Sequence, residues 1–192
     1  AFYAEWFANR LREGFVFVRN PFNPVSVTRY ELDPSVVDLI GFCSKNPAPM
    51  LPYMDLLQPF HQYWFVTITP YGKDLEPHVP DKAAVMETFR ALSRIVGLPC
   101  IAWRYDPIIL NEYWTAARHI EAFASMCSTL AGYTNTCVIS FIDLYEKVKR
   151  NFPQAKQVPL QTQLEITREF VRIAASYDMV IKPCAESSVL ET

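Results

Sequence analysis

The stretch Ile101–Pro107 limits the possible folds of this chain more than any other part of the sequence. Residues two apart on a β-strand share a face. The two faces so defined are Ile101, Trp103 and Tyr105 on one side, and Ala102, Arg104 and Asp106 on the other. The first face is bulky throughout, whereas the second begins small and ends in opposite charges. This pattern is typical of a barrel strand with helices outside and a polar mouth inside. We therefore expect Trp103 among helices, and Arg104 and Asp106 in the interior.

Apolar segments that resemble strands alternate with helical patterns along the chain. Six such segments cover residues 15–18, 39–43, 64–69, 101–106, 137–142 and 180–182. Repeated β-α units predict an α/β fold with a parallel sheet. A complete (β/α)₈ barrel typically takes about 250 residues, and this chain has 192. We predict one domain over residues 1–192, a partial or trimmed TIM-type barrel with six visible strands. The alternative is a doubly wound open sheet, although no G-x-G-x-x-G turn is present.

Composition narrows the class of protein further. Hydrophobic residues make up 51% of the chain and charged residues 20%, which excludes a disordered protein. The net charge of −2 gives no general attraction to nucleic acid. No apolar run reaches the roughly 18 residues of a membrane span, so a soluble protein is expected. The thiols are odd in number and unclustered, which favours reduced cysteines in the cytoplasm. They are Cys43, Cys100, Cys127, Cys137 and Cys184. We expect buried, structural thiols except at Cys184.

Polar side chains follow the predicted strands, and the carboxyl ends of parallel strands form the active face of α/β proteins. The candidate catalytic residues are Arg104, Asp106 and Glu186. The candidate substrate-binding residues are Arg19, Asn20, Lys45, Asn46, Thr69, Tyr71, Lys73, Ser140, Asp143 and Lys182. Asp143 is out of phase with the inward face of its strand unless the chain bends. Because the charges balance well enough to pair with each other, a structural ion network is the alternative to a binding site.

Other chemistries are possible at the same strand ends. None of the three histidines follows a strand, which argues against a His-rich metal site or a Ser-His-Asp triad. Three carboxylates on successive strands, Asp106, Asp143 and Glu186, could share Mg²⁺ or Mn²⁺ in a lyase or isomerase. A non-catalytic anion-binding domain is a further alternative. Lys182 could form a Schiff base if deprived of water, but the nearby acids favour a structural or ligand-pairing lysine.

Several short motifs occur in an order that is specific as a set. They are Val18-Arg19-Asn20-Pro21, Ser44-Lys45-Asn46-Pro47-Ala48-Pro49, Thr67-Ile68-Thr69-Pro70-Tyr71-Gly72-Lys73, Trp103-Arg104-Tyr105-Asp106-Pro107-Ile108 and Cys184-Ala185-Glu186. Over essentially the whole chain, this order resembles the bacterial family called domain of unknown function 1848. That family is similar to radical S-adenosylmethionine enzymes on TIM-type barrels, and it carries a cysteine cluster near its C-terminus.

The resemblance implies an iron–sulfur cluster and S-adenosylmethionine as cofactors. This chain lacks the preceding strand with its Arg-Thr-Asp motif and stops before the clustered cysteines, so we expect a fragment without the cluster ligands. The first hypothesis is therefore a radical-type enzyme domain acting on a small anionic or nucleotide-like substrate. By charge alone, Asp106 or Glu186 would meet an amino group of a ligand, and Arg104 or Lys45 its carboxylate. The resemblance names no reaction, and the sequence gives no oligomeric state.

Overall fold

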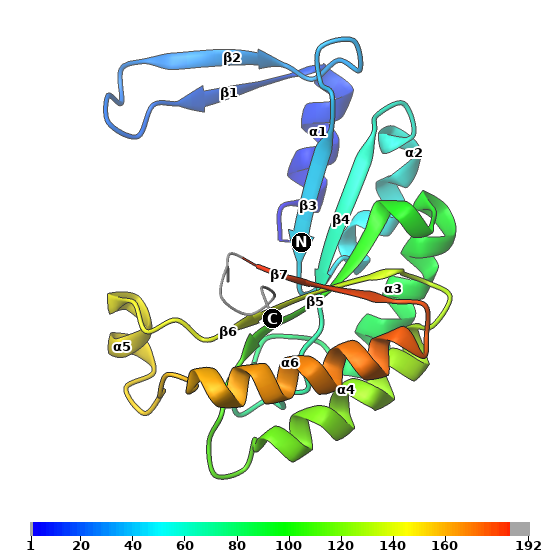
Figure 1. Ribbon diagram of the computed structural model, residues 1–192. Coiled ribbons are helices and arrows are strands. Elements are labelled where there is room, and N and C mark those ends of the chain that lie inside the picture. The colour runs from blue at the N-terminus through cyan, green and yellow to red at the C-terminus, as the bar shows by residue number, and fades with distance from the viewer. Residues whose placement is uncertain (1, 185–192) are drawn as a thin grey trace.

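The computed structural model describes residues 2–184, and a curved parallel sheet forms its centre (Figure 1). The strands are β3 (Ile40–Ser44), β4 (Gln62–Thr67), β5 (Ile101–Ile108), β6 (Thr136–Phe141) and β7 (Val180–Pro183). They lie side by side in chain order, and every neighbouring pair is parallel. The carboxyl ends of all five strands therefore meet at one edge of the sheet.

Helices cover the convex face of this sheet, as Figure 1 shows for α2, α3, α4 and α6. The α-helices are α1 (Ala4–Glu13), α2 (Met54–Leu57), α3 (Lys82–Val96), α4 (Ala116–Leu130), α5 (Glu146–Asn151) and α6 (Leu160–Ala175). Two short 3₁₀ helices are also present: η1 (Ala48–Tyr53) lies between β3 and α2, and η2 (Leu98–Cys100) lies between α3 and β5. No helix in residues 2–184 is long and apolar enough to cross a membrane.

Helix α3 illustrates how the sequence specifies these elements. Asp81 caps its first turn, since the Asp81 carboxylate accepts a hydrogen bond from the backbone N–H of Ala83 at 2.9 Å. Val85, Phe89 and Leu92 recur at helical spacing and are buried against the sheet. The helix ends before Gly97, whose positive φ of 86° suits a residue without a Cβ.

The core lies between the convex face and the helices, with Trp103 near its centre. The Trp103 ring stacks on Phe123 of α4 with 5.0 Å between centroids, and Phe123 stacks on Phe170 of α6 at 3.8 Å. The indole N–H of Trp103 donates to the carbonyl of Ile68 at 2.9 Å, which satisfies its buried polar atom. The prediction that Trp103 packs among helices is confirmed.

The predicted first strand does not belong to the parallel sheet. Instead, β1 (Phe15–Arg19) pairs with β2 (Val27–Glu31) as an antiparallel hairpin, which projects from the body in Figure 1. The segment between β1 and β2 is too short for a parallel crossover, which needs a dozen or more residues. The prediction of six strands in one sheet is therefore wrong, and the parallel sheet has five in the described residues.

The α/β class and the parallel sheet are confirmed, but a closed barrel is not seen in residues 2–184. There β3 and β7 each have one neighbour and form the two edges of the sheet. An open sheet is also what the doubly wound alternative predicts. The sheet is nevertheless curved, and within the described part of the chain no helix layer covers its concave face (Figure 1).

Candidate functional site

The concave face carries a polar cluster on β5 near the carboxyl edge of the sheet. Arg104 and Asp106 form an ion pair there, and each side chain is about one-fifth exposed, at 21%. The Ser140 hydroxyl on β6 donates to Oδ1 of Asp106 at 2.7 Å, while Arg104 occupies Oδ2. Both carboxylate oxygens of Asp106 are thus held in place. Alternation along the strand correctly predicted that Arg104 and Asp106 lie opposite Trp103.

The guanidinium of Arg104 also reaches two thiols at opposite edges of the sheet. Its Nη1 lies 3.7 Å from Sγ of Cys43 on β3, and its Nη2 lies 3.5 Å from Sγ of Cys184 after β7. In a flat sheet with strands about 4.8 Å apart, these edges would be about 19 Å from each other. One side chain touches both thiols because the sheet curls around Arg104. The prediction that Cys43 is buried is wrong, since Cys43 is exposed like Cys184.

Burial opposes the charge of Arg104, but Asp106 and the neighbouring thiols outweigh that effect. The pKa of Arg104 is consequently raised above its ordinary value. One nitrogen, Nε, is buried and has no hydrogen-bond partner among residues 2–184. The guanidinium is therefore a fixed positive charge, held by Asp106 and the two thiols.

A second polar cluster centres on Glu76, which the sequence analysis did not single out. Its side chain is 10% exposed and lies in the loop between β4 and α3. The Glu76 carboxylate accepts hydrogen bonds from Lys45 Nζ at 2.5 Å, from Thr69 Oγ1 at 2.9 Å, and from Lys82. Burial alone would raise the Glu76 pKa, but the two lysines hold it below its ordinary value. Through these hydrogen bonds, Glu76 links the segments that follow β3 and β4 to the first residue of α3.

Two predicted ligand-binding residues have structural partners. Tyr71 is 2% exposed, donates its hydroxyl to the carbonyl of Pro107 at 2.7 Å, and accepts from the N–H of Ile109 at 2.8 Å. Burial raises the pKa of Tyr71, so its phenol stays neutral. Lys73 donates to the carbonyls of Pro77, at 3.4 Å, and Val79. These contacts brace the end of β5 and the loop before α3.

Other predicted site residues are dispersed. Arg19 donates to the carbonyl of Pro24 at 3.3 Å, and the Asn20 side chain accepts from two backbone N–H groups in the hairpin turn. Their placement at the sheet edge is wrong, because β1 belongs to the hairpin. Asp143 follows β6 and is exposed, and Lys182 is exposed on β7 in register with Val138. Glu186 lies outside the described residues.

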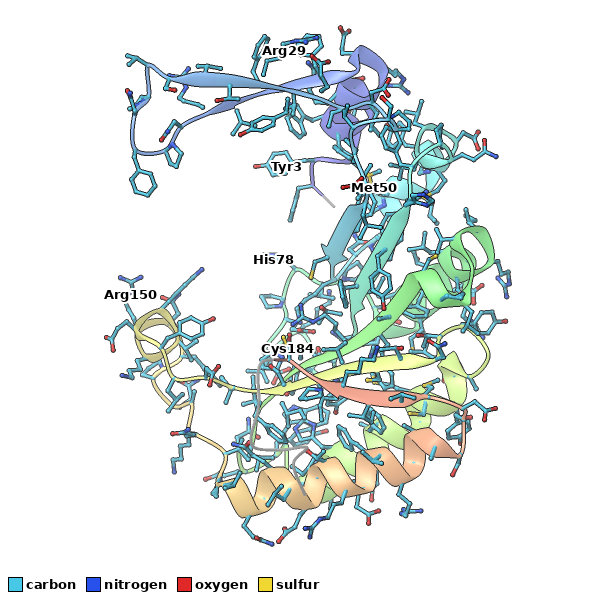
Figure 2. All side chains as sticks on the ribbon, turned by 45° about the horizontal axis from the view of Figure 1, so that its top comes forward. Tyr3, Arg29, Met50, His78, Arg150 and Cys184 are labelled. Atoms are coloured by element: carbon cyan, nitrogen blue, oxygen red, sulfur yellow. The ribbon has the colours of Figure 1, made fainter. Side chains whose placement is uncertain are left out.

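A pocket of about 760 Å³ opens beyond the end of β3. Its lining is Phe2, Tyr3, Cys43, Ser44, Lys45, Asn46, Pro49, His78, Val79 and Pro80. Aromatic and apolar side chains thus meet Lys45, Asn46 and His78 in one hollow, and Cys43 connects it to the Arg104 cluster. Figure 2 shows Tyr3, His78 and Cys184 along the concave side of the sheet. The pocket adjoins both polar clusters.

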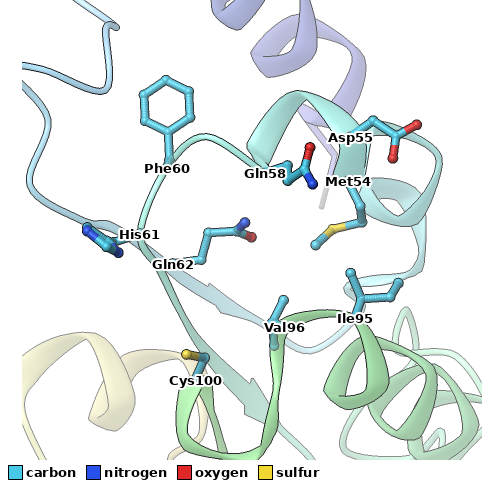
Figure 3. A pocket seen from close by; sticks show the side chains of 9 residues that line it. All are labelled: Met54, Asp55, Gln58, Phe60, His61, Gln62, Ile95, Val96 and Cys100. Atoms are coloured by element: carbon cyan, nitrogen blue, oxygen red, sulfur yellow. The ribbon is translucent and has the colours of Figure 1, made fainter.

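A smaller pocket of about 370 Å³ lies at the opposite end of the strands (Figure 3). It is lined by Met54, Asp55, Gln58, Phe60, His61, Gln62, Ile95, Val96 and Cys100. Gln62 is already used structurally, since it donates to the carbonyl of Leu57 at 2.8 Å and accepts from the Trp64 indole at 3.1 Å. Because parallel sheets bind ligands at the carboxyl ends of their strands, the functional site is assigned to the other edge.

Across residues 2–184, no group of three or more His, Cys, Asp or Glu side chains is arranged to hold a metal ion. No curated protein and no solved structure matches the chain at a significant level. A family model does match, and it covers residues 1–192. The chain therefore belongs to the family described as Domain of unknown function (DUF1848).

Proposed function

We propose that this domain binds a small anionic, nucleotide-like substrate at the carboxyl edge of its sheet. We further propose that it is part of an enzyme of the radical S-adenosylmethionine type that its family resemblance implies. The described residues do not fit an iron–sulfur cluster, because they contain no suitable group of three or more ligands. The proposal for residues 2–184 therefore concerns how substrate and nucleotide are held.

The observation that carries the proposal is an excess of positive charge around a pocket at the strand ends. Glu76 faces two lysines, Lys45 and Lys82, so one carboxylate is shared by two cations. Arg104 and Asp106 balance each other. A ligand with a phosphate or carboxylate would restore neutrality at Lys45, which is the more exposed lysine at 37% against 21% for Lys82.

The lining of the 760 Å³ pocket supports a nucleotide in particular. Tyr3 and Phe2 offer aromatic rings, and every nucleobase presents a flat face that stacks on such rings. Lys45 lies on the polar wall, where it would meet a phosphate or a carboxylate. A ligand of this class would thus have one apolar and one anionic end.

Asp106 supplies the complementary function next to the pocket. Its carboxylate is oriented by Arg104 and Ser140, so its remaining lone pairs point in fixed directions. A substrate amine or hydroxyl would donate to these lone pairs. Arg104 would meet a second anionic group through its planar fork of donors. These residues bind and orient, and the proposal assigns them no bond-breaking step.

Isothermal titration calorimetry with adenosine 5′-monophosphate, S-adenosylmethionine and adenosine tests the proposal. We expect the first two to bind and adenosine, which lacks an anionic group, to bind at least about tenfold more weakly. Lys45→Met should weaken binding of the monophosphate about tenfold. Lys149→Met is the matched control, because Lys149 pairs with Glu146 on the exposed helix α5. Equal affinity for monophosphate and adenosine, or equal effects of the two substitutions, would contradict the proposal.

A further inference from the structure

Cys43 and Cys184 are far apart in the sequence but meet at the same guanidinium. Cys43 lies within β3, where it pairs with Phe65 of β4. Cys184 follows β7, and its backbone N–H donates to the carbonyl of Ile139 at 2.9 Å. Both thiols are exposed, and each lies within 3.7 Å of a terminal nitrogen of Arg104. The curvature of the sheet therefore creates a dithiol across the open concave face.

The remaining cysteines differ from this pair in environment. Burial raises the pKa of Cys127 to about 12, and burial also raises the pKa of Cys137 well above its ordinary value. Both thiols are consequently unreactive. Cys100 is partly exposed, but it lies at the opposite end of the strands in the smaller pocket. No cation contact is found for the sulfur of Cys100 among the described residues.

We propose that Cys43 and Cys184 form a redox-sensitive dithiol that a hydroperoxide oxidises to an intramolecular disulfide. Both sulfurs are exposed and contact terminal nitrogens of the same guanidinium, so Arg104 holds the two thiols on one side of the sheet, where a hydroperoxide can reach them. Arg104 also belongs to the proposed binding site, but the oxidation involves only the two thiols and a hydroperoxide, so it needs no bound substrate.

The reaction balances with one hydroperoxide. One thiolate attacks the distal peroxide oxygen and breaks the O–O bond, which gives a sulfenic acid and releases an alcohol or water after protonation. The second thiolate attacks the sulfenic sulfur, forms the S–S bond and displaces hydroxide, which leaves as water. The two sulfurs lose two electrons in total, and the peroxide bond gains them.

The disulfide would link the two edges of the open sheet. Cys184 lies just beyond Pro183, the last residue of β7. To form the disulfide, the end of β7 would therefore move toward β3. Arg104 would give up its two sulfur contacts and keep Asp106. A cross-link between residues 43 and 184 would close a long loop, which stabilises a folded chain by restricting its unfolded state.

Mass spectrometry after limited peroxide treatment tests the proposal. The native protein is exposed to equimolar hydrogen peroxide, its free thiols are alkylated in denaturant, and a non-reducing digest is analysed. We expect a Cys43–Cys184 cross-linked peptide in monomeric protein, with the other three thiols alkylated. Cys43→Ser should leave a sulfenic acid on Cys184 that dimedone traps, whereas the matched control Cys100→Ser should cross-link like the wild type. Arg104→Gln should slow cross-linking about tenfold.

Three results would overturn the proposal. The first is a disulfide between two molecules, seen as a doubled mass on a non-reducing gel. The second is separate oxidation of Cys43 and Cys184 without a cross-link. The third is oxidation of Cys100 at the rate of Cys43, which would show that Arg104 and the concave face confer no selectivity. A normal far-ultraviolet circular dichroism spectrum for each variant makes these outcomes interpretable.

Discussion

The two faces of β5 have different roles although their residues alternate along one strand. On the convex face, Trp103 and Tyr105 are fully buried and contact aromatic rings of α4 and α6. On the concave face, Arg104 and Asp106 remain partly exposed and contact charged, hydroxyl and thiol groups. One strand thus supplies a buried apolar face and a partly exposed polar face, and its residues alternate between the two. Substitutions one position apart should therefore have different consequences.

The largest expected effect is the contrast between Trp103→Ala and Arg104→Ala. Truncating Trp103 removes its stacking on Phe123 and leaves a cavity, so we expect a loss of about 3–5 kcal/mol in the free energy of unfolding. Loss of Arg104 leaves Asp106 with Ser140 and partial access to water, so about 1–2 kcal/mol is expected. Urea denaturation midpoints measure both changes. Equal destabilisation would mean that Arg104 belongs to a structural ion network.

A second prediction concerns His119, which contacts Tyr105 on the convex face of β5. His119 is fully buried, and its Nε2–H must donate to the carbonyl of Ile109 at 2.9 Å, because a carbonyl only accepts. Its Nδ1 therefore accepts from the Tyr105 hydroxyl at 2.7 Å. Burial is the main reason that the pKa of His119 falls below the ordinary 6.5. Tyr105 and Tyr71 face this ring and stay neutral, since burial raises the pKa of both.

The folded protein should consequently lose stability on mild acidification. Below pH 6.5 the unfolded chain binds a proton at this histidine before the folded chain does, so stability falls until pH passes the lower, folded pKa. The slope within that window should be at most about 1.4 kcal/mol per pH unit. Thermal unfolding from pH 7 to pH 5 measures the slope, and His119→Gln should reduce it. His61→Gln is the control, because His61 is exposed. An unchanged slope in His119→Gln would contradict the assignment.

Alternation of large and polar residues made much of this arrangement predictable from the sequence. In β5 it separated Trp103 from Arg104 and Asp106 correctly, because strand geometry alone fixes which residues share a face. It also placed Ser140 on the side of Asp106, and the two are hydrogen-bonded. The five strands of the parallel sheet were recognised because helical patterns separate them.

The failures have a physical cause as well. An apolar run such as Phe15–Val18 has no period that distinguishes a parallel strand from a hairpin strand, and the partner decides between them. Glu76 was missed because it lies in a loop, where no periodicity shows which side chains turn inward. Its partners, Lys45, Thr69 and Lys82, meet it only through tertiary folding. Side-chain contacts made by loop residues cannot be predicted from the spacing of residues along the sequence.

Glu76 gives a third, smaller prediction about the concave side. It pairs with Lys45 and Lys82 and would compete with an anionic ligand for them, so Glu76→Gln should bind adenosine 5′-monophosphate about fivefold more tightly. Glu146→Gln is the matched control, because Glu146 forms an exposed pair with Lys149. Calorimetric titration of both variants decides the matter. Weaker binding by Glu76→Gln would show that Glu76 positions the lysines and does not compete with the ligand.

The smallest effect is expected at Lys182, which shares the concave face with Arg104 through their common register with Val138. A lysine becomes a Schiff-base nucleophile when its ammonium form is deprived of water. Lys182 is exposed, so this condition is not met, and we infer a ligand-pairing or surface role. Borohydride reduction with small aldehydes and keto acids, followed by peptide mapping, should give no more adduct at Lys182 than at the exposed Lys149. Selective trapping at Lys182 would contradict this inference and would indicate carbonyl chemistry on the concave face.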